Sequence, residues 1–332
     1  MKSRLGWLPR VGIAVAGSLW VLAVACRYPL DGLYALPLER PPTAADWDGA
    51  TPLERGAVGG RSSAPAEGDV DADAVHTTTA SCHHGAKVPP VPVQLRAFWT
   101  PERLYLQVRW DDPTDSRGPL WRWDGRRWQA AAPGSDGVGI LWGSGAGWNC
   151  AQVCHLRDWR MAGQRAMADY AMAVEQGPPP LDFWVWRAGY GSTEGMAVDA
   201  VLGADGRRDD GGDPEESFFP NSVQAASGGS HPFGEGDRPV TAPDPAPGAQ
   251  APGFSAARLP AARTELTAQP LRTARGWSLT LSRPLAASEA GDVGFAPGGE
   301  YPFGLSILDA VDRDHLVVPE TIHLRLVAAE RP

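Results

Sequence analysis

The stretch that decides the fold is VPVQLRAFWTPERLYLQVRW, residues 91–110. Apolar residues alternate with other residues in both of its halves, at Val91, Val93, Leu95, Ala97 and Trp99 and again at Leu104, Leu106, Val108 and Trp110. A period of two is typical of a strand with one buried face. Between the halves, Pro101 stands where a type I turn accepts proline. The stretch therefore predicts a β-hairpin.

Further strand candidates follow along the chain, most of them short and bounded by Gly, Pro or Asp, which makes the predicted fold all-β. These strands are expected at Gly137–Trp142, Phe183–Arg187, Trp277–Leu281, Tyr301–Leu308 and Thr321–Val327. Only residues 158–174 look helical, because apolar residues recur there at spacings of three and four. Residues 203–260 are dense in Gly, Pro, Asp and Ser and predict a long irregular loop. We expect a β-sandwich with one helical insertion.

Residues 1–25 predict a secretory signal peptide. Three basic residues precede an apolar run over residues 11–25, which is short for a membrane span of about 20 residues. Ala23-Val24-Ala25 before Cys26 indicates either an ordinary cleavage site or a lipoprotein signal whose Cys26 carries lipid. We therefore expect a periplasmic or otherwise extracytoplasmic protein that contacts a membrane only through a lipid on Cys26.

Residues 26–84 differ in composition from the rest of the chain. They are rich in Pro, Gly, Ala and acidic residues and lack a sustained period, although Trp47 and Leu53 could hold part of them against a domain. Such a composition predicts a low-complexity tether with a partly ordered end. The folded domain is then expected over residues 85–330.

Charge and motifs exclude several function classes. The formal net charge is −9, which makes nucleic acid a poor partner. Cleavage of the signal would remove its three basic residues and make the net charge of the remaining chain more negative. No glycine-rich phosphate loop or catalytic constellation stands out in the sequence, so we predict no catalytic residues and a protein that is not itself an enzyme.

The motif Cys150-Ala-Gln-Val-Cys154-His155 puts two thiols and an imidazole within six residues. Three chemistries suit this grouping: a Cys150–Cys154 disulfide, two thioethers to a haem, and a metal pair completed by His155. The usual haem attachment motif has two residues between its cysteines, whereas three stand here. Cys82 could instead pair with one of the two in an oxidising compartment.

Tryptophan is abundant, with 14 residues in the chain, and most of them lie in its central part. Two interpretations are open: a sandwich core with its rim, or a flat apolar pocket for a planar cofactor or a sugar.

Several landmarks occur in a fixed order along the chain. They are Trp110–Ser116, Trp121, Trp128, Asp136–Trp142, Cys150–His155, Phe183–Arg187, Gly276–Leu285, Asp292-Val293, and Tyr301 through Asp309 to His315. Together they resemble the haem-binding domain of ethylbenzene dehydrogenase gamma subunits and related exported cytochromes, over roughly residues 85–328. The resemblance implies an immunoglobulin-like β-sandwich that holds one haem b between loops and passes electrons. It also implies a molybdenum enzyme or another cytochrome as redox partner.

The chain departs from the gamma subunits at an iron ligand. The Trp-x-Trp-Lys of that family becomes Trp184-Val185-Trp186-Arg187, and a guanidinium that keeps its proton does not bind iron. The branch with Cys-x-x-x-Cys-His resembles this chain better, which makes His155 the leading axial ligand. We expect the second ligand to be His315 or Met161, with Met172 and His83 as further candidates.

The resemblance leaves two matters open. Haem b is favoured and covalent haem c through Cys150 and Cys154 is the alternative. The competing function is a non-catalytic carbohydrate- or metal-binding β-sandwich lipoprotein that has lost haem.

Overall fold

The predicted hairpin is present in the computed structural model. Strands β4 (Val91–Trp99) and β5 (Arg103–Asp111) pair antiparallel, with Val93 opposite Trp110 and Trp99 opposite Leu104. The Thr100 N–H donates to the Arg103 carbonyl oxygen at 2.8 Å and closes the turn. The hairpin is confirmed, including the position of its turn.

The structure describes residues 32–58, 68–69, 90–118, 120–131, 134–143, 159–162, 165–168, 181–189, 197–203, 206–209, 218–220, 239, 245–256, 265–287, 289–311 and 315–329. Residues 33–332 form one unit, and residues 1–32 form another that lies almost wholly outside the described ranges.

The remaining elements are nearly all strands. The first part of the chain forms β1 (Leu33–Pro37), α2 (Ala44–Gly49), β2 (Leu53–Ala57), β3 (Gly68–Asp69), β6 (Leu120–Trp123), β7 (Trp128–Ala131) and β8 (Ser135–Trp142). The middle forms β9 (Trp159–Ala162), β10 (Arg165–Ala168), β11 (Leu181–Arg187), β12 (Val198–Gly203), β13 (Gly206–Asp209), β14 (Phe218–Pro220), β15 (Gln250–Pro252) and β16 (Phe254–Ala256). The last part forms β17 (Thr267–Arg272), β18 (Gly276–Pro284), β19 (Glu300–Val311), β20 (Leu316–Val317) and β21 (Ile322–Leu326).

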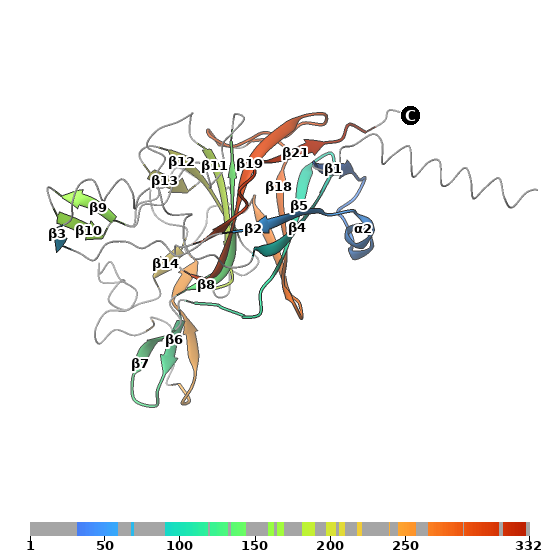
Figure 1. Cartoon of the computed structure of the whole chain (residues 1–332). Coiled ribbons are helices and arrows are strands. Elements are labelled where there is room, and N and C mark those ends of the chain that lie inside the picture. Colours follow the sequence, from blue (N-terminus) through green and yellow to red (C-terminus); the bar gives the residue numbers. More distant parts are fainter. Residues whose placement is uncertain are drawn as a thin grey trace, which may run out of the picture. The chain divides into compact units, whose positions relative to one another are not determined.

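One large sheet carries most of these strands. Its order is β13-β12-β11-β8-β19-β21-β1-β4-β5-β18-β17, with β2 paired to β4 and β20 paired to β19. The sheet curls so that one half, β13 to β19, faces the other half, β4 to β17 (Figure 1). Three small sheets, β3-β10-β9, β14-β16 and β15-β6-β7, complete the described strands.

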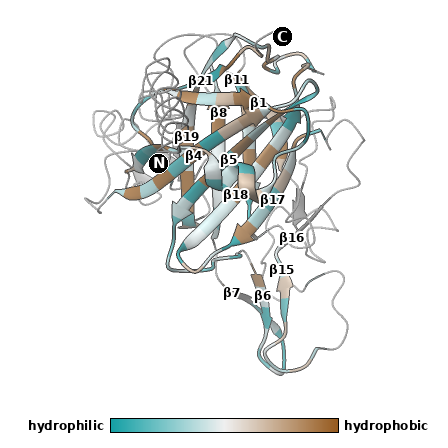
Figure 2. Ribbon diagram, turned by 90° about the vertical axis from the view of Figure 1, so that its right-hand side faces the viewer, coloured by the Kyte–Doolittle hydropathy of each residue, from teal (hydrophilic) through white to brown (hydrophobic). Residues whose placement is uncertain are grey.

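The core lies between the two halves of the curled sheet (Figure 2). Trp186 of β11 meets Trp277 of β18 with ring centroids 5.3 Å apart, and Trp110 of β5 lies within 6.4 Å of both. Each of these three rings is at most 3% exposed. Because aromatic rings bury large areas, this trio contributes strongly to holding the two halves together.

The predicted all-β sandwich is confirmed. The strands expected at residues 137–142, 183–187, 277–281, 301–308 and 321–327 correspond to β8, β11, β18, β19 and β21. All five lie in the large sheet.

The helix expected over residues 158–174 is wrong. The described residues there form β9 and β10, which pair antiparallel with Met161 opposite Ala166. Apolar spacings of three and four over so few residues also fit two short strands. Gly163, which follows β9, disfavours a continuous helix by about 1 kcal/mol. The helix among the described residues is α2 instead.

One further expectation differs from the structure. The long loop over residues 203–260 contains the strands β13 to β16, so it has more structure than its composition indicated. Within residues 26–84, for which we expected a tether with a partly ordered end, residues 33–57 form β1, α2 and β2, and both Trp47 and Leu53 are buried. β1 lies in the large sheet and is parallel to both β21 and β4. The strands β1 and β2 pair with partners that are distant in sequence, and local composition does not indicate such pairing.

The predicted signal peptide, residues 1–25, and Cys26 lie outside the described residues. In the part of the chain that the structure describes, no helix has the length and apolar character needed to cross a membrane.

Gly137 of β8 provides a test of this packing. A Cβ on Gly137 would collide with the Trp186 carbonyl oxygen and come within 3.2 Å of Leu308 Cδ1. We expect Gly137→Ala to lower the free energy of unfolding by about 1–3 kcal/mol, because the β8–β11 pairing must shift. Denaturant unfolding measures this.

Gly49→Ala in α2 is the matched control, since nothing lies within 4 Å of the added Cβ. It should be neutral or stabilising by up to about 1 kcal/mol. Equal stability of the two variants would contradict the close approach at Gly137.

Candidate functional site

The half of the sheet built from β8, β11, β12 and β19 is buried on both of its faces. Alternate residues such as Val138, Ile140 and Trp184 point into the core. The residues between them point to the opposite face, called here the outer face. Its apolar members are Leu141, Phe183, Val185, Val198, Ala200, Leu202, Leu308 and Val317, each at most 6% exposed.

His315 lies on this outer face. The register pairs Leu316 with Ile307, which places His315 opposite Leu308. Leu316 packs against the core, so alternation puts His315 on the other side, and the histidine is 8% exposed. His315 is therefore a buried imidazole on an apolar face of the sheet.

A single row across four strands connects His315 with Arg187. Leu308 pairs with Gly137, and Gly137 pairs with Arg187. Directly opposed residues share a face, and three strand spacings separate the ends of the row by about 14 Å. The position where the resembling gamma subunits have their ligand lysine thus lies on the same face as His315.

The other predicted ligands cannot be placed in this row. Cys150, Cys154 and His155 lie outside the described residues, as do Cys82, His83 and Met172. Met161 lies in β9, of which only the backbone pairing is described. Of the predicted haem ligands, His315 is therefore the one whose surroundings the structure describes.

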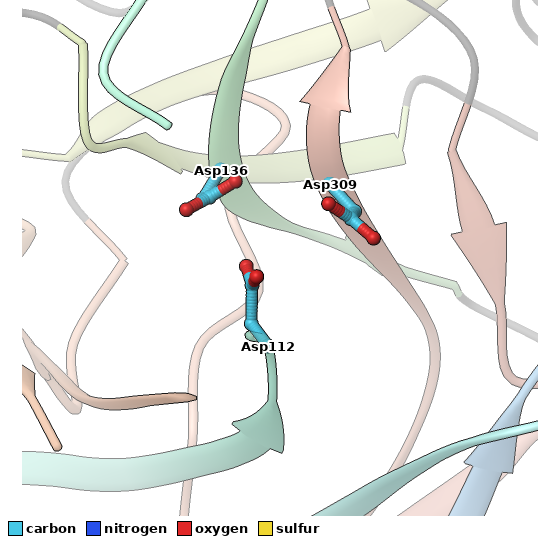
Figure 3. A group of neighbouring side chains, drawn as sticks. All are labelled: Asp112, Asp136 and Asp309. Carbon is cyan, nitrogen blue, oxygen red and sulfur yellow. The ribbon is translucent and has the colours of Figure 1, made fainter. Parts of the chain in front are cut away.

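A group of three carboxylates lies near the start of β8 and the end of β19, which are adjacent because the two strands are antiparallel. Asp112 follows β5, Asp136 is in β8 and Asp309 is in β19, and Figure 3 shows the three side chains gathered from these separate strands. One carboxylate oxygen from each lies within 4.8 Å of the other two. We call these three residues the Asp136 cluster.

Asp136 is tied to its surroundings by three donors. Its Oδ2 accepts from the Ser116 N–H at 2.8 Å and from Trp277 Nε1 at 2.9 Å, and its Oδ1 accepts from the Ala310 N–H at 3.1 Å. Ala310 has φ of 53°, unusual for a residue other than glycine, at the point where β19 shifts register against β8. The bend directs its N–H toward the carboxylate.

Two members of the Asp136 cluster have raised pKa values. Burial raises the pKa of Asp136, and the charge of Asp112 adds to the effect, although the three hydrogen bonds oppose it. Burial and the charge of Asp136 raise the pKa of Asp309. The electrostatics therefore disfavour three bare negative charges at this place.

A second cluster of carboxylates lies at the opposite end of the core, around Arg283. Its guanidinium contacts Asp182 at 2.5 Å, Asp292 at 2.5 Å and Asp199 at 3.1 Å. The side chains of Arg283, Asp182 and Asp292 have no solvent exposure. Burial alone would lower the pKa of Arg283, but the three carboxylates outweigh it and raise the pKa. We call these four residues the Arg283 cluster.

Comparison with protein families identifies the group to which this chain belongs. The family model described as ethylbenzene dehydrogenase matches residues 44–316. The chain belongs to the ethylbenzene dehydrogenase family. The match begins at α2, so the ethylbenzene dehydrogenase domain includes residues that composition had assigned to a tether.

Comparisons with individual proteins add less than the ethylbenzene dehydrogenase match. No curated protein matched the chain. Among solved structures, the chain is similar to a family 9 carbohydrate-binding module from Caldicellulosiruptor kristjanssonii in complex with glucose (8% identity, TM-score 0.32, 91% of this chain and 96% of that chain). It is also similar to a putative carbohydrate-binding protein from Bacteroides uniformis (9% identity, TM-score 0.33, 91% and 93%). Likenesses this weak carry no argument about ligands.

The landmarks that resembled the ethylbenzene dehydrogenase family coincide with the two buried clusters. Asp112 and Asp136 belong to the Asp136 cluster, whereas Arg283 and Asp292 belong to the Arg283 cluster. In the sequence these residues served only as landmarks, and their meeting in space was not predicted. A signal was present for Asp112, Asp136 and Arg283, because each lies two residues from an inward-facing apolar residue of its strand, in phase with the core.

Removal of the Arg283 charge should be among the most damaging single changes. Arg283→Met leaves three carboxylates buried without their cation, so we expect a loss of about 3–5 kcal/mol in the free energy of unfolding. Arg275→Ala is the control, because Arg275 pairs with Asp111 with its own side chain 80% exposed. This control should change stability by less than about 1 kcal/mol. Similar losses for both variants in urea unfolding would refute the role given to Arg283.

Proposed function

We propose that this chain binds one haem and transfers electrons, without catalysing a reaction of its own. The observation that carries the proposal is the match to the ethylbenzene dehydrogenase family over residues 44–316. The gamma subunits of ethylbenzene dehydrogenase, which this chain resembles in sequence, are haem proteins. The buried imidazole of His315 on the apolar outer face supports it. When bound, haem supplies a reversible one-electron couple.

The described residues fit a haem ligand on chemical grounds. Haem iron accepts neutral imidazole as an axial ligand, and His315 carries that group out of the solvent. The apolar side chains of the outer face keep water away from it and lower the local polarity, two of the factors by which a protein tunes a redox centre. Arg187, in the same row, offers a guanidinium, which has donors but no acceptor lone pair for iron.

His155, the leading ligand candidate of the sequence, is proposed to bind the iron together with His315, and Met161 is the alternative to His155. His155 and Met161 lie in the connection between β8 and β11, which starts and ends at the same end of the sheet because Trp142 pairs with Asp182. The row of His315 lies five residues back along β8, about 17 Å away. The twelve residue-to-residue steps from Gly143 to His155 span up to about 40 Å, so His155 can reach that row.

Haem b is the proposed form, with Cys150 and Cys154 joined in a disulfide that shapes the loop presenting His155. Covalent haem c through the two thiols is the alternative, disfavoured by the third residue between them. Subunits of a molybdenum enzyme, or other cytochromes, are the proposed redox partners. The proposed location is periplasmic or extracytoplasmic, with Cys26 as the site of a lipid anchor.

The competing carbohydrate-binding function drew on the surplus of tryptophan. The structure accounts for many of these residues in another way, since the buried ones are Trp47, Trp99, Trp110, Trp121, Trp142, Trp184, Trp186 and Trp277. A buried ring presents no face to a sugar. Trp123 and Trp128, 5.7 Å apart on β6 and β7, are partly exposed.

An absorption spectrum tests the proposal directly. The full chain, exported by a host that loads haem, should show a Soret band and α bands that appear on reduction. Pyridine haemochrome and haem staining of denaturing gels then distinguish the two forms: haem b is lost on denaturation, whereas haem c stays on the chain. A colourless protein from such a host would overturn the proposed function.

Histidine variants test the ligands. His315→Ala and His155→Ala should each abolish or shift the Soret band, because each removes an imidazole proposed to bind iron. His323→Ala is the matched control: His323 is 39% exposed in its side chain and pairs with Glu300 at 2.8 Å. Its spectrum should equal that of the unmodified protein. If His315→Ala behaved like this control, His315 would be excluded as a ligand.

A further inference from the structure

The Asp136 cluster differs from the Arg283 cluster in one respect that points to a ligand. Both bring three carboxylate oxygens within 4.8 Å of one another. In the Arg283 cluster a guanidinium sits among them and balances part of the charge. Among the described residues, no arginine, lysine or histidine side chain is seen to bond to a carboxylate of the Asp136 cluster.

Arg272 contacts the backbone of the loop that carries Asp112, and not the Asp112 carboxylate. Arg272 donates to the carbonyl oxygens of Asp112 and Thr114 at 2.8 and 2.7 Å. Its other terminal nitrogen, Nη1, is buried and has no hydrogen-bond partner among the described residues. Arg272 therefore supports the loop that holds Asp112 without neutralising the carboxylate by direct contact.

Asp112 carries the second observation. The residue is 2% exposed, and its Oδ1 accepts from the Thr114 N–H at 2.8 Å and from Thr114 Oγ1 at 2.9 Å. Its Oδ2 is buried and has no hydrogen-bond partner among the described residues. Figure 3 shows this carboxylate pointing toward Asp136. An ionised oxygen without a partner in the interior is strongly unfavourable, so this atom requires a cation or a proton.

The donors decide which cation fits. All three side chains offer oxygen, which suits the hard cations Ca²⁺ and Mg²⁺ better than zinc or copper. Ca²⁺ takes six to eight oxygen ligands in flexible geometry, whereas Mg²⁺ keeps several of its waters and is usually bound by only one or two carboxylates, so three converging carboxylates favour Ca²⁺. Asp309 is exposed, so water can complete the coordination from its side.

We propose that Asp112, Asp136 and Asp309 bind one divalent cation, with Ca²⁺ preferred over Mg²⁺. The cation ties β5 to β8 and β19, and so joins the two halves of the sheet at the end where His315 lies. The site is distinct from the outer face, because Asp136 points toward Trp277 in the core.

Calorimetric titration of the full chain tests this site. Protein freed of metal by dialysis against EDTA is titrated with CaCl₂ and, separately, with MgCl₂. We expect one Ca²⁺ per chain, an affinity for Mg²⁺ at least tenfold weaker, and a melting temperature that rises with Ca²⁺. Absence of binding heat together with an unchanged melting temperature would overturn the proposal, whatever the haem spectrum shows.

Two variants locate the ion. Asp309→Asn removes an exposed ligand, so the fold should be retained while the affinity for Ca²⁺ falls at least tenfold. Asp111→Asn is the matched control, since Asp111 is adjacent to Asp112 but pairs with Arg275 on the surface. Its affinity should be unchanged. An unaltered affinity for Ca²⁺ in Asp309→Asn would refute the site.

Discussion

Arg283 brings a positive charge into the interior, and both halves of the sheet are arranged around it. The residue belongs to β18, whereas Asp182 and Asp199 belong to β11 and β12 of the facing half. Any packing that separated these groups would leave a charge buried and unpaired, which is far less favourable than the loss of a few apolar contacts. The ion cluster therefore restricts how the halves can face each other at one end of the core, while Trp110, Trp186 and Trp277 fill the space toward the other.

The predictable part of the fold was the part recorded in the local sequence. The hairpin over residues 91–110 has apolar residues at a period of two, and the strands β8, β11, β18, β19 and β21 were found as short segments, most of them bounded by Gly, Pro or Asp. The strand β1 could not be found in this way, because its five residues join β21 and β4, which are close to it only in the folded chain. The error over residues 158–174 has a related origin: the pairing of β9 with β10, rather than the spacing of their apolar residues, decides the local structure.

Of the two candidate sites, one could be predicted from the sequence and the other could not. His315 was predicted from its place among ordered landmarks, and the register puts it on a buried apolar face. The Asp136 cluster was not predicted, because Asp112 and Asp309 are far apart in sequence and meet only through the pairing of β8 with β19 and the closure of the sandwich. Charged residues that fall in phase with the buried positions of a strand are the signal in the sequence for such clusters. Asp136 continues the inward series of Val138 and Ile140, and Arg283 continues that of Leu279 and Leu281.

Neighbouring residues of one strand serve the two sides of the sheet. In β8, Asp136 points inward to its cluster and Gly137 belongs to the row of His315. In β19, Leu308 belongs to that row and Asp309 to the cluster. Insertion or deletion of a single residue in either strand would exchange the two sides and disturb both sites at once. Changes of length are therefore better tolerated in the connections, such as that between Gly143 and Leu181, because they leave the register on which both sites rest unaltered.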